Sequence, residues 1–221
     1  MKKVLFVCSG NTCRSPLAEA IFHKLKPDES YEAQSAGMMA MDGKPMSEGS
    51  KAALAKQGLA EQHLSQGLTG HHLEWADVIL TMTENHKRSI FEIFPDKELN
   101  LYTLKEFILD DPETENLIQK LYHHIAQLEL KRAAFITKHQ GKVDKYNNEG
   151  QDISGQDELE EELLAQLKPE QEAIELVSSK LPSFDISDPY GAGNEVYEDT
   201  YRELEEAVQK LIIKLKETND E

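Results

Sequence analysis

The amino-acid sequence predicts an α/β protein with a compact four-stranded parallel sheet, flanking helices and a helical insertion. Short apolar runs bounded by turn residues alternate with segments in which apolar residues recur at helical spacing. This alternation is typical of parallel sheets, in which a helix connects each strand to the next. One stretch, residues 110–180, has helical spacing and no strand signal. We therefore expect a core formed by 1–109 and 181–221 that is interrupted by an insertion at 110–180.

The first strand and the first helix have the clearest signals. Val4–Val7 is an uninterrupted apolar run, and its shortness and its β-branched and aromatic content favour a strand buried on both faces. The run ends at the turn residues Ser9–Asn11. From Pro16 to Leu25 apolar residues recur at helical spacing, and proline suits a first helical turn. The chain therefore opens with a strand, a turn and a helix.

The same alternation continues through the rest of the core. Further strands are expected at 31–36, 77–82 and 99–104, and further helices at 47–57, at 73–76 (the end of a helix), at 83–94 and at 195–216. Gly37, Gly58 and Pro95 provide the expected ends of these elements. In the last helix, apolar residues such as Leu204 and Val208 share one face, which we expect to pack on the sheet.

The insertion at 110–180 is interpreted as a helical hairpin. One amphipathic series extends from Leu117 to Phe135 and a second from Leu159 to Val177, with a polar loop at 147–156 between them. The insertion contains sixteen acidic and eight basic residues and so contributes −8 to the net charge of the chain. A partly disordered acidic insert is therefore the alternative.

The composition indicates an acidic, soluble chain. Of 221 residues, 41 are acidic and 24 are basic, which gives a formal net charge of −17 at pH 7. A phosphate backbone repels such a surface, so we expect no nucleic-acid partner. No apolar run approaches the roughly 18 residues of a membrane span. The apolar run near the start is too short for a secretory signal, and we expect a cytoplasmic protein without a membrane partner.

The segment Cys8–Pro16, between the first strand and the first helix, contains the residues that indicate a chemistry. Backbone N–H groups of a loop that opens a helix can surround a tetrahedral oxyanion, assisted by the helix dipole. A thiol must ionise to attack phosphorus, and helix N-termini favour the thiolate, so Cys8 is the candidate nucleophile. Arg14 can bind two phosphoryl oxygens and stabilise the charge of the transition state. The alternative is a small buried cysteine at a strand end.

Neighbouring residues support this hypothesis. Ser15 can donate a hydrogen bond to the sulfur of Cys8. Gly10 and Asn11 tolerate the left-handed backbone conformations that a tight anion-binding loop needs. The only two cysteines, Cys8 and Cys13, are too few for a disulfide framework or a closed zinc site. We therefore expect no metal.

At this point the sequence resembles a known family. The segment VLFVCSGNTCRSPLAEAIF is similar to the signature of the low-molecular-weight protein phosphatases, Asp188-Pro189-Tyr190 to their general-acid loop, and Ser35-Ala36-Gly37 to a further family motif. The resemblance implies hydrolysis of phosphorylated proteins through a phosphocysteine intermediate, without metal or cofactor. It also implies that Asp188 protonates the leaving group and then activates water, which is worth roughly 10²–10⁴ in rate. A plain turn is the alternative for this loop.

These observations give a set of candidate site residues. The candidate catalytic residues are Cys8, Arg14 and Asp188, and the candidate substrate-binding residues are Ser9, Gly10, Asn11, Thr12, Cys13, Ser15 and Tyr190. The resemblance places His63 near a family histidine that hydrogen-bonds behind the phosphate loop, with a solvated histidine as the alternative. The pairs His71-His72 and His123-His124 are interpreted as surface residues, because adjacent residues on a helix point to different faces.

The substrate prediction depends on Thr12 and Gly191. The resemblance implies that tyrosine-specific members usually have a branched aliphatic residue in place of Thr12, whereas bacterial protein-arginine phosphatases have threonine within Gly-Asn-Thr-Cys-Arg-Ser. Tyrosine-directed members often have a second aromatic residue where this chain has Gly191. Phosphoarginine is therefore the expected substrate and phosphotyrosine the alternative.

Other functions remain open. Arsenate reductases share a similar loop but pass oxidation to further cysteines, which this chain lacks. A non-catalytic sensor of phosphate or redox state is another alternative. Cys13 is close enough to Cys8 in sequence for a reversible disulfide that would protect a reactive thiolate from over-oxidation, with a packed loop residue as the alternative. The insertion joins the fourth strand to the loop of Asp188, so we expect it to regulate access or to bind a protein partner, with a decorative helical pair as the alternative.

Overall fold

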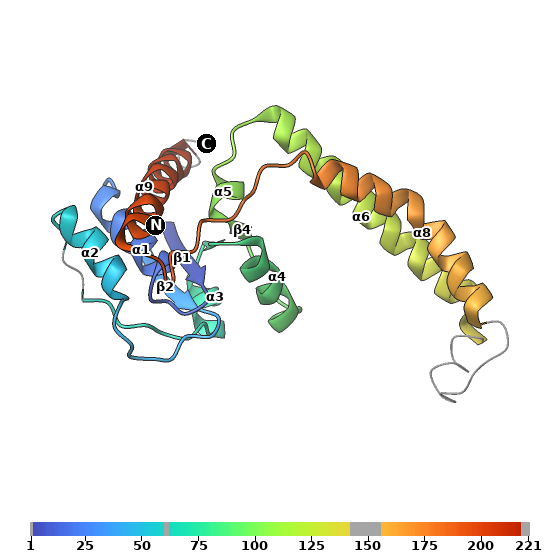
Figure 1. The fold of residues 1–221 in the computed structure, drawn as a ribbon, viewed down its shortest axis with the longest axis horizontal. Helices are drawn as coiled ribbons and strands as arrows, with labels where there is room; N and C mark the ends of the chain where they lie inside the picture. The colour runs from blue at the N-terminus through green and yellow to red at the C-terminus, as the bar shows by residue number, and fades with distance from the viewer. Residues whose placement is uncertain (1, 60–61, 142–155, 218–221) are drawn as a thin grey trace. The chain divides into compact units, whose positions relative to one another are not determined.

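The computed structural model describes residues 2–59, 62–141 and 156–217, and Figure 1 shows the path of the chain. The chain divides into two compact units, one of residues 1–109 and 184–221 and the other of residues 110–183. The polar loop predicted at 147–156 lies, except for its last residue, outside the described residues. In the described part, no helix is long and apolar enough to cross a membrane.

Four parallel strands form the sheet of the first unit, in the order β2-β1-β3-β4. They are β1 (Lys2–Cys8), β2 (Tyr31–Gly37), β3 (Val78–Thr81) and β4 (Leu101–Thr103). Because β1 is an inner strand with helices on both faces, its apolar run Val4–Val7 is completely buried. The predicted four-stranded parallel sheet is confirmed, and β3 and β4 are shorter than the predicted strands.

Helices flank this sheet. Those of the first unit are α1 (Arg14–Leu25), α2 (Glu48–Lys56), α3 (Gly70–Trp75), α4 (Glu84–Ile93), α5 (Leu104–Phe107) and α9 (Asn194–Glu217). The sequence pattern does not predict α5, because it continues the fourth strand through Leu104. The short helix forms because the Thr103 hydroxyl accepts the Glu106 N–H while the Glu106 carboxylate accepts the Thr103 N–H.

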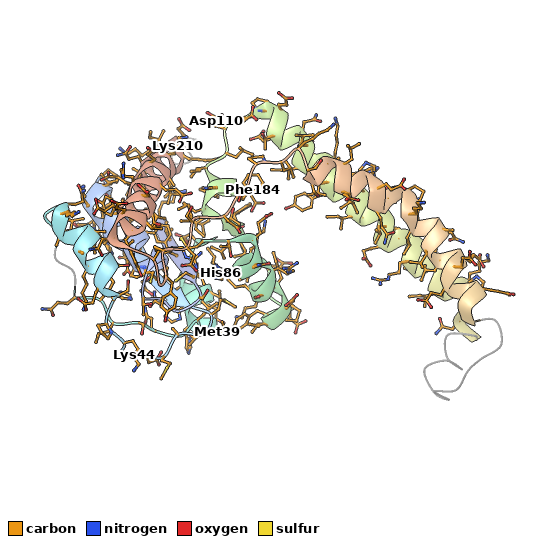
Figure 2. The ribbon with its side chains drawn as sticks, in the orientation of Figure 1. Met39, Lys44, His86, Asp110, Phe184 and Lys210 are labelled. Atoms are coloured by element: carbon orange, nitrogen blue, oxygen red, sulfur yellow. The ribbon has the colours of Figure 1, made fainter. Side chains whose placement is uncertain are left out.

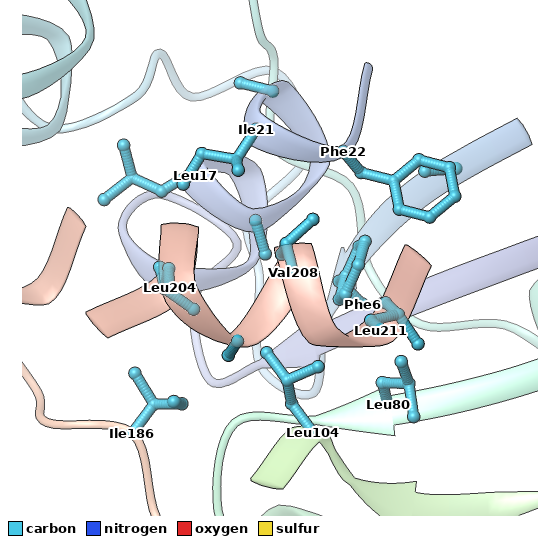
Figure 3. Close-up of a cluster of buried hydrophobic side chains, with 14 of the residues drawn as sticks. Phe6, Leu17, Ile21, Phe22, Leu80, Leu104, Ile186, Leu204, Val208 and Leu211 are labelled. Carbon is cyan, nitrogen blue, oxygen red and sulfur yellow. The ribbon is translucent and has the colours of Figure 1, made fainter. Parts of the chain in front are cut away.

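Helices cover both faces of the sheet, and successive side chains of β1 point to opposite faces. Phe6 belongs to the larger apolar cluster, which includes Leu17 of α1 and Val208 of α9 (Figure 3). Leu5 belongs to the second cluster, which includes Ile90 of α4. The amphipathic last helix therefore packs on the sheet as the sequence predicts.

The carboxyl ends of β1 and β3 lie side by side at one edge of the sheet. Val7 is in register with Thr81. The loop after β1 opens α1, and Thr83, just after β3, caps α4 by accepting a backbone N–H. The segment that returns at Phe184 joins the same edge, because the Ile186 N–H donates to the carbonyl of Met82 at 2.8 Å. In open α/β sheets, ligands bind at this edge.

The second unit consists of two helices that run side by side, α6 (Pro112–Lys138) and α8 (Gln156–Ser178), as Figure 1 shows. The predicted additional helices are therefore present. Among the described residues of this unit, only Phe135 and Leu167 are buried. Most of the apolar surface of the pair is thus only partly covered within the unit.

Charged side chains connect the two helices of the second unit. Glu170 accepts hydrogen bonds from His124 at 2.7 Å and from Lys131 at 2.9 Å. These bonds hold the pKa of the Glu170 carboxyl below its ordinary value. His124, predicted as a surface residue, instead lies half-buried between the helices. Position along a helix alone could not reveal this, because the pairing depends on the second helix.

Candidate active site

The loop between β1 and α1 brings Cys8 and Ser15 together. The side chain of Cys8 is buried, and its Sγ lies 3.0 Å from the Ser15 Oγ. The Ser15 Oγ accepts a hydrogen bond from Asn11 Nδ2 at 3.0 Å, so the hydroxyl hydrogen is available to the sulfur. The carbonyl of Ala36 lies at 3.4 Å as a weaker acceptor. This arrangement can stabilise a thiolate at Cys8.

Asn11 holds the loop in shape with its side chain and its backbone. It is the residue of the loop with a left-handed backbone, with φ of 52°. Its buried side chain donates to Ser35 Oγ at 2.8 Å and accepts the Gln66 N–H at 2.9 Å. Gly10 does not adopt a positive φ, so the conformational reason predicted for that glycine is wrong. The loop makes its left-handed turn at the asparagine alone.

Gly37 explains the Ser-Ala-Gly motif at the end of β2. A Cβ at this position would lie 2.8 Å from the Asn11 nitrogen and 2.8 Å from the Ser9 carbonyl oxygen. Backbone atoms cannot give way as a flexible side chain can, so only glycine lets β2 approach the loop this closely. The motif therefore positions the loop rather than a reacting group.

His63 also supports the loop. Its Nε2 lies 2.9 Å from the carbonyl oxygen of Asn11, to which it donates. Its Nδ1 lies 3.8 Å from Glu19, which in turn accepts a hydrogen bond from Ser35. Burial lowers the pKa of the His63 imidazole. The structure thus places His63 behind the loop, as the resemblance implies.

Arg14 and Asp188 form an ion pair across this edge of the sheet. The Arg14 Nη2 lies 2.8 Å from Asp188 Oδ2. The Arg14 side chain is 6% exposed and the Asp188 side chain 52% exposed. The Arg14 Nη1 donates to the Ile186 carbonyl at 3.3 Å, while its buried Nε has no hydrogen-bond partner. A buried N–H without a partner is available to an anion.

The segment that carries Asp188 is anchored on both sides. Lys105 donates to the Asp185 carbonyl at 2.7 Å, and its ammonium lies 2.6 Å from Glu203 of α9. Glu203 also accepts the Ser187 N–H at 3.2 Å. Residues from α5 and α9 thereby fix the position of Asp188, which helical or strand patterns in its own segment could not show.

A pocket of about 680 Å³ lies at this edge. Its lining includes Ser9, Arg14, Met39, His86 and Asp188; Met39 and His86 are labelled in Figure 2. Three of the predicted site residues therefore line the pocket directly. The arrangement combines a hydroxyl, a guanidinium and a carboxylate around one cavity.

The other predicted site residues lie elsewhere. Those buried outside the pocket lining are Cys8, Asn11, Cys13 and Ser15. Gly10 and Thr12 are half-buried in the loop and do not line the pocket. Tyr190 is 77% exposed and does not line it either. Tyr190 therefore does not contact the pocket, although its backbone N–H donates to Asp188 Oδ1 at 3.2 Å.

Cys13 faces away from the pocket toward α2 and α9. Its Sγ donates to Ser47 Oγ at 3.3 Å and lies 3.9 Å from the Tyr197 hydroxyl. Both cysteines are free thiols. A disulfide with Cys8 would require Cys13 to leave these partners, so protection of Cys8 by Cys13 stays a prediction.

His86 also lines the pocket, although the sequence pattern does not point to it. Its Nε2 lies 2.8 Å from Ser9 Oγ, and its Nδ1 lies 2.9 Å from Thr83 Oγ1. Burial and the positive charge of Arg14 lower its pKa to about 4. A signal was available: Thr83 follows a strand adjacent to β1, so the first turn of the next helix had to lie at the same edge.

We predict that His86 makes the fold sensitive to acid. In the unfolded chain the imidazole binds a proton near pH 6.5, but in the folded protein only near pH 4. Stability therefore falls as the pH drops through this window. Between pH 7 and pH 4.5 the free energy of unfolding should decrease in both proteins, and the decrease should be about 1–2 kcal/mol smaller in His86→Gln than in the wild type. This figure allows for the partial exposure of His86. Urea denaturation at several pH values measures this difference.

The matched control for this prediction is His71→Gln, because the His71 side chain is 98% exposed. That variant should keep the pH dependence of the wild type. Some dependence of the free energy of unfolding on pH should remain in both variants, since His63 also has a lowered pKa. Identical slopes for wild type and His86→Gln would contradict the prediction.

Comparison with known protein families gives a match that includes Cys8 and Arg14 and ends before Asp188. Residues 3–134 match the family described as low molecular weight phosphotyrosine protein phosphatase. The matched segment contains β1 from its second residue onward, the other three strands, the loop with Cys8 and Arg14, and His86.

Two relatives have different substrates in their names. The chain is 41% identical over 106 residues to a protein-arginine-phosphatase of Geobacillus stearothermophilus, which covers 48% of this chain and 71% of the relative. It is also 41% identical over 114 residues to the low molecular weight protein-tyrosine-phosphatase PtpB of Staphylococcus epidermidis, which covers 52% of this chain and 79% of that protein. Sequence identity alone therefore does not separate the two substrates.

Solved structures show the same fold. The YwlE arginine phosphatase from Geobacillus stearothermophilus superposes with a TM-score of 0.62 at 27% identity, with 99% of this chain and 95% of that chain covered. A low molecular weight protein tyrosine phosphatase from T. tengcongensis gives a TM-score of 0.61 at 28% identity, with 97% and 99% covered. The chain belongs to the low molecular weight phosphotyrosine protein phosphatase family and is a cysteine-dependent phosphatase.

Proposed function

We propose that this phosphatase hydrolyses phosphoarginine in proteins through a phosphocysteine intermediate at Cys8. The observation that carries the proposal is the chemistry of the pocket: its lining contains the carboxylates of Asp185 and Asp188 and, among the described residues, no phenylalanine, tyrosine or tryptophan. A guanidinium group is cationic and planar, and carboxylates bind it well. A phenyl ring would instead be favoured by aromatic neighbours.

The charges of the pocket support the same substrate. Among the described residues that line the pocket, only Arg14 has a permanent positive charge, and the phosphoryl group would bind to it. The lowered pKa of about 4 keeps His86 neutral at physiological pH. The leaving-group side is therefore acidic, which stabilises the guanidinium that forms when the phosphorus–nitrogen bond breaks.

In the first step, the thiolate of Cys8 attacks phosphorus. A sulfur–phosphorus bond forms, the phosphorus–nitrogen bond breaks, and Asp188 donates its proton to the leaving nitrogen. The hydrogen bond from Ser15, whose Oγ is 3.0 Å from the Cys8 sulfur, stabilises the thiolate. On binding, the phosphoryl group replaces the Asp188 carboxylate at Arg14, because both anions compete for the same N–H groups, and the displaced carboxylate takes up from solvent the proton that it then donates.

In the second step, water attacks the phosphocysteine. The Asp188 carboxylate takes a proton from the water, the oxygen–phosphorus bond forms, and the sulfur–phosphorus bond breaks. Inorganic phosphate leaves and the thiolate is regenerated. Arg14 balances the negative charge of the phosphoryl oxygens in both steps, and the neighbouring N–H groups of the loop supply further donors.

We predict that the wild type prefers phosphoarginine and that Thr12→Val weakens this preference. The wild-type kcat/KM for a phosphoarginine peptide should exceed that for a matched phosphotyrosine peptide by at least about tenfold, and the variant should shift this ratio toward phosphotyrosine by roughly tenfold. The reason is that valine removes a hydroxyl from the loop without changing its size. Parallel measurements of phosphate release test both parts.

The same assay distinguishes the alternatives. A wild type that prefers phosphotyrosine would overturn the phosphoarginine proposal and favour a protein-tyrosine phosphatase. A labelled enzyme isolated after an acid quench, with phosphate on Cys8, would support the intermediate for either substrate. Failure to find it under single-turnover conditions would contradict the intermediate independently of the substrate.

A further inference from the structure

Helix α6 carries two series of residues at coiled-coil spacing. The first series faces α8 and comprises Thr114, Leu117, Leu121, His124, Leu128, Lys131 and Phe135. Its orientation follows from the bonds of His124 and Lys131 to Glu170 and from the burial of Phe135. Its steps alternate between three and four residues, as in a heptad seam. This seam accounts for the pairing of the two helices.

The second series, which we call the outer seam, lies next to the first on the same helix. It comprises Ile118, Tyr122, Ile125, Glu129, Arg132 and Ile136. These residues are also three or four apart, so they form a continuous stripe. Tyr122 is 52% exposed, and Ile125 and Ile136 are each 40% exposed. A helix that is apolar on two adjacent faces has room for a second partner.

The charges of the outer seam are arranged symmetrically about its centre. Glu129 and Arg132 lie between Ile125 and Ile136, with four residues from each isoleucine to the nearer charge and three residues between the charges. The Arg132 Nη1 lies 3.7 Å from Glu129 Oε1 on the same helix, and both side chains are more than half exposed. The order apolar, acidic, basic, apolar therefore becomes its own complement when it is reversed.

From this arrangement we propose that the outer seam of α6 is a dimer interface for a second copy of this chain. In an antiparallel pair of outer seams, Ile125 faces Ile136 of the other copy, and Glu129 faces Arg132. The two-fold axis repeats each contact, as an isologous interface requires. Opposite charges then meet at the centre and apolar side chains on either side of them. This interface does not depend on the proposed substrate.

Self-complementary charge favours a second copy over an unrelated partner. A basic partner would meet Arg132 and an acidic partner would meet Glu129, so each would face one like charge. The pairing also covers an apolar surface that the helix pair leaves exposed: among its described residues the second unit buries only Phe135 and Leu167. Two such units would together form a four-helix arrangement with a larger apolar interior.

The first test is the mass of the full chain in solution. Light scattering after size exclusion should give about twice the 25.0 kDa of one chain at roughly 100 μM. The variant Ile125→Glu should weaken dimerisation by about 100-fold or more, because it buries a charge against an apolar side chain. Leu130→Glu is the matched control, since Leu130 is 62% exposed on the same helix but outside the outer seam. It should keep the dimer.

A charge exchange gives a second readout. Glu129→Arg alone should weaken the dimer by about tenfold, because two arginines of one copy would then face two of the other. The double variant Glu129→Arg/Arg132→Glu restores opposite charges and should restore the dimer. Circular dichroism and phosphatase activity should be unchanged in all of these variants, which shows that each one folds.

Cross-linking tests the antiparallel register directly. In the double variant Ile125→Cys/Ile136→Cys, oxidation should join position 125 of one copy to position 136 of the other. The two positions are 11 residues apart on one helix, about 16 Å, so they cannot form a disulfide within a chain. Neither single variant should cross-link. A mass of 25.0 kDa at all concentrations, or a dimer unaffected by both Ile125→Glu and the charge reversal, would overturn the proposal.

Discussion

Replacing Cys8 by serine is expected to lower kcat by about 10⁴-fold or more. A serine hydroxyl ionises far less readily than a thiol. The hydrogen bond from Ser15, at 3.0 Å from the sulfur, can stabilise a thiolate but cannot compensate for that difference. Initial rates with a phosphoarginine peptide and with a simple aryl phosphate measure the loss.

The fold of Cys8→Ser should be intact, because serine is slightly smaller than cysteine and the neighbouring Ser15 can still bond to it. Thermal unfolding and circular dichroism check this point. A variant that keeps more than about one hundredth of the wild-type rate would contradict the assignment of Cys8 as the nucleophile.

The second large effect is expected for Asp188→Asn, which should lower kcat by about 10²–10⁴. Asparagine cannot protonate the leaving group or deprotonate water. The loss should be smaller for aryl phosphates with good leaving groups, because these need less protonation. A series of aryl phosphates with leaving groups of different basicity measures the dependence.

The ion pair with Arg14 adds an independent readout for the same variant. In the wild type the Asp188 carboxylate lies 2.8 Å from the Arg14 guanidinium and competes with an incoming anion. Asp188→Asn should therefore bind inorganic phosphate several-fold more tightly, by about 1 kcal/mol. An unchanged inhibition constant for phosphate together with an unchanged kcat would exclude Asp188 from the reaction.

Local patterns predict much of the fold. The run Val4–Val7 favours a short buried strand, and the change to helical spacing after Pro16 marks the start of a helix. Such features depend on residues that are close in sequence. The short helix α5 is not predicted, because its capping box, Thr103 and Glu106, overlaps a strand pattern that includes Leu104.

The candidate site is harder to predict, because distant segments build it. Cys8, Ser15 and Arg14 lie in one motif, so their association follows from the sequence. His86 and the lysine and glutamate that anchor the 185–188 segment come from other elements. Only the register of β1 with β3 and the return of the chain at Phe184 bring them together. The predicted left-handed conformation of Gly10 is also wrong, because the backbone dihedrals depend on how the whole loop closes.

The order of the elements along the chain also affects how the protein is made. All four strands are complete by Thr103, but α9, which covers one face of the sheet, begins at Asn194. At typical translation rates the ribosome needs roughly 5–20 s to synthesise the intervening segment. During that time Phe6 and Leu80 lack the apolar surface of Val208 and Leu211, with which they form one cluster in the finished fold. One face of the nascent sheet therefore stays partly uncovered until the last helix has been synthesised.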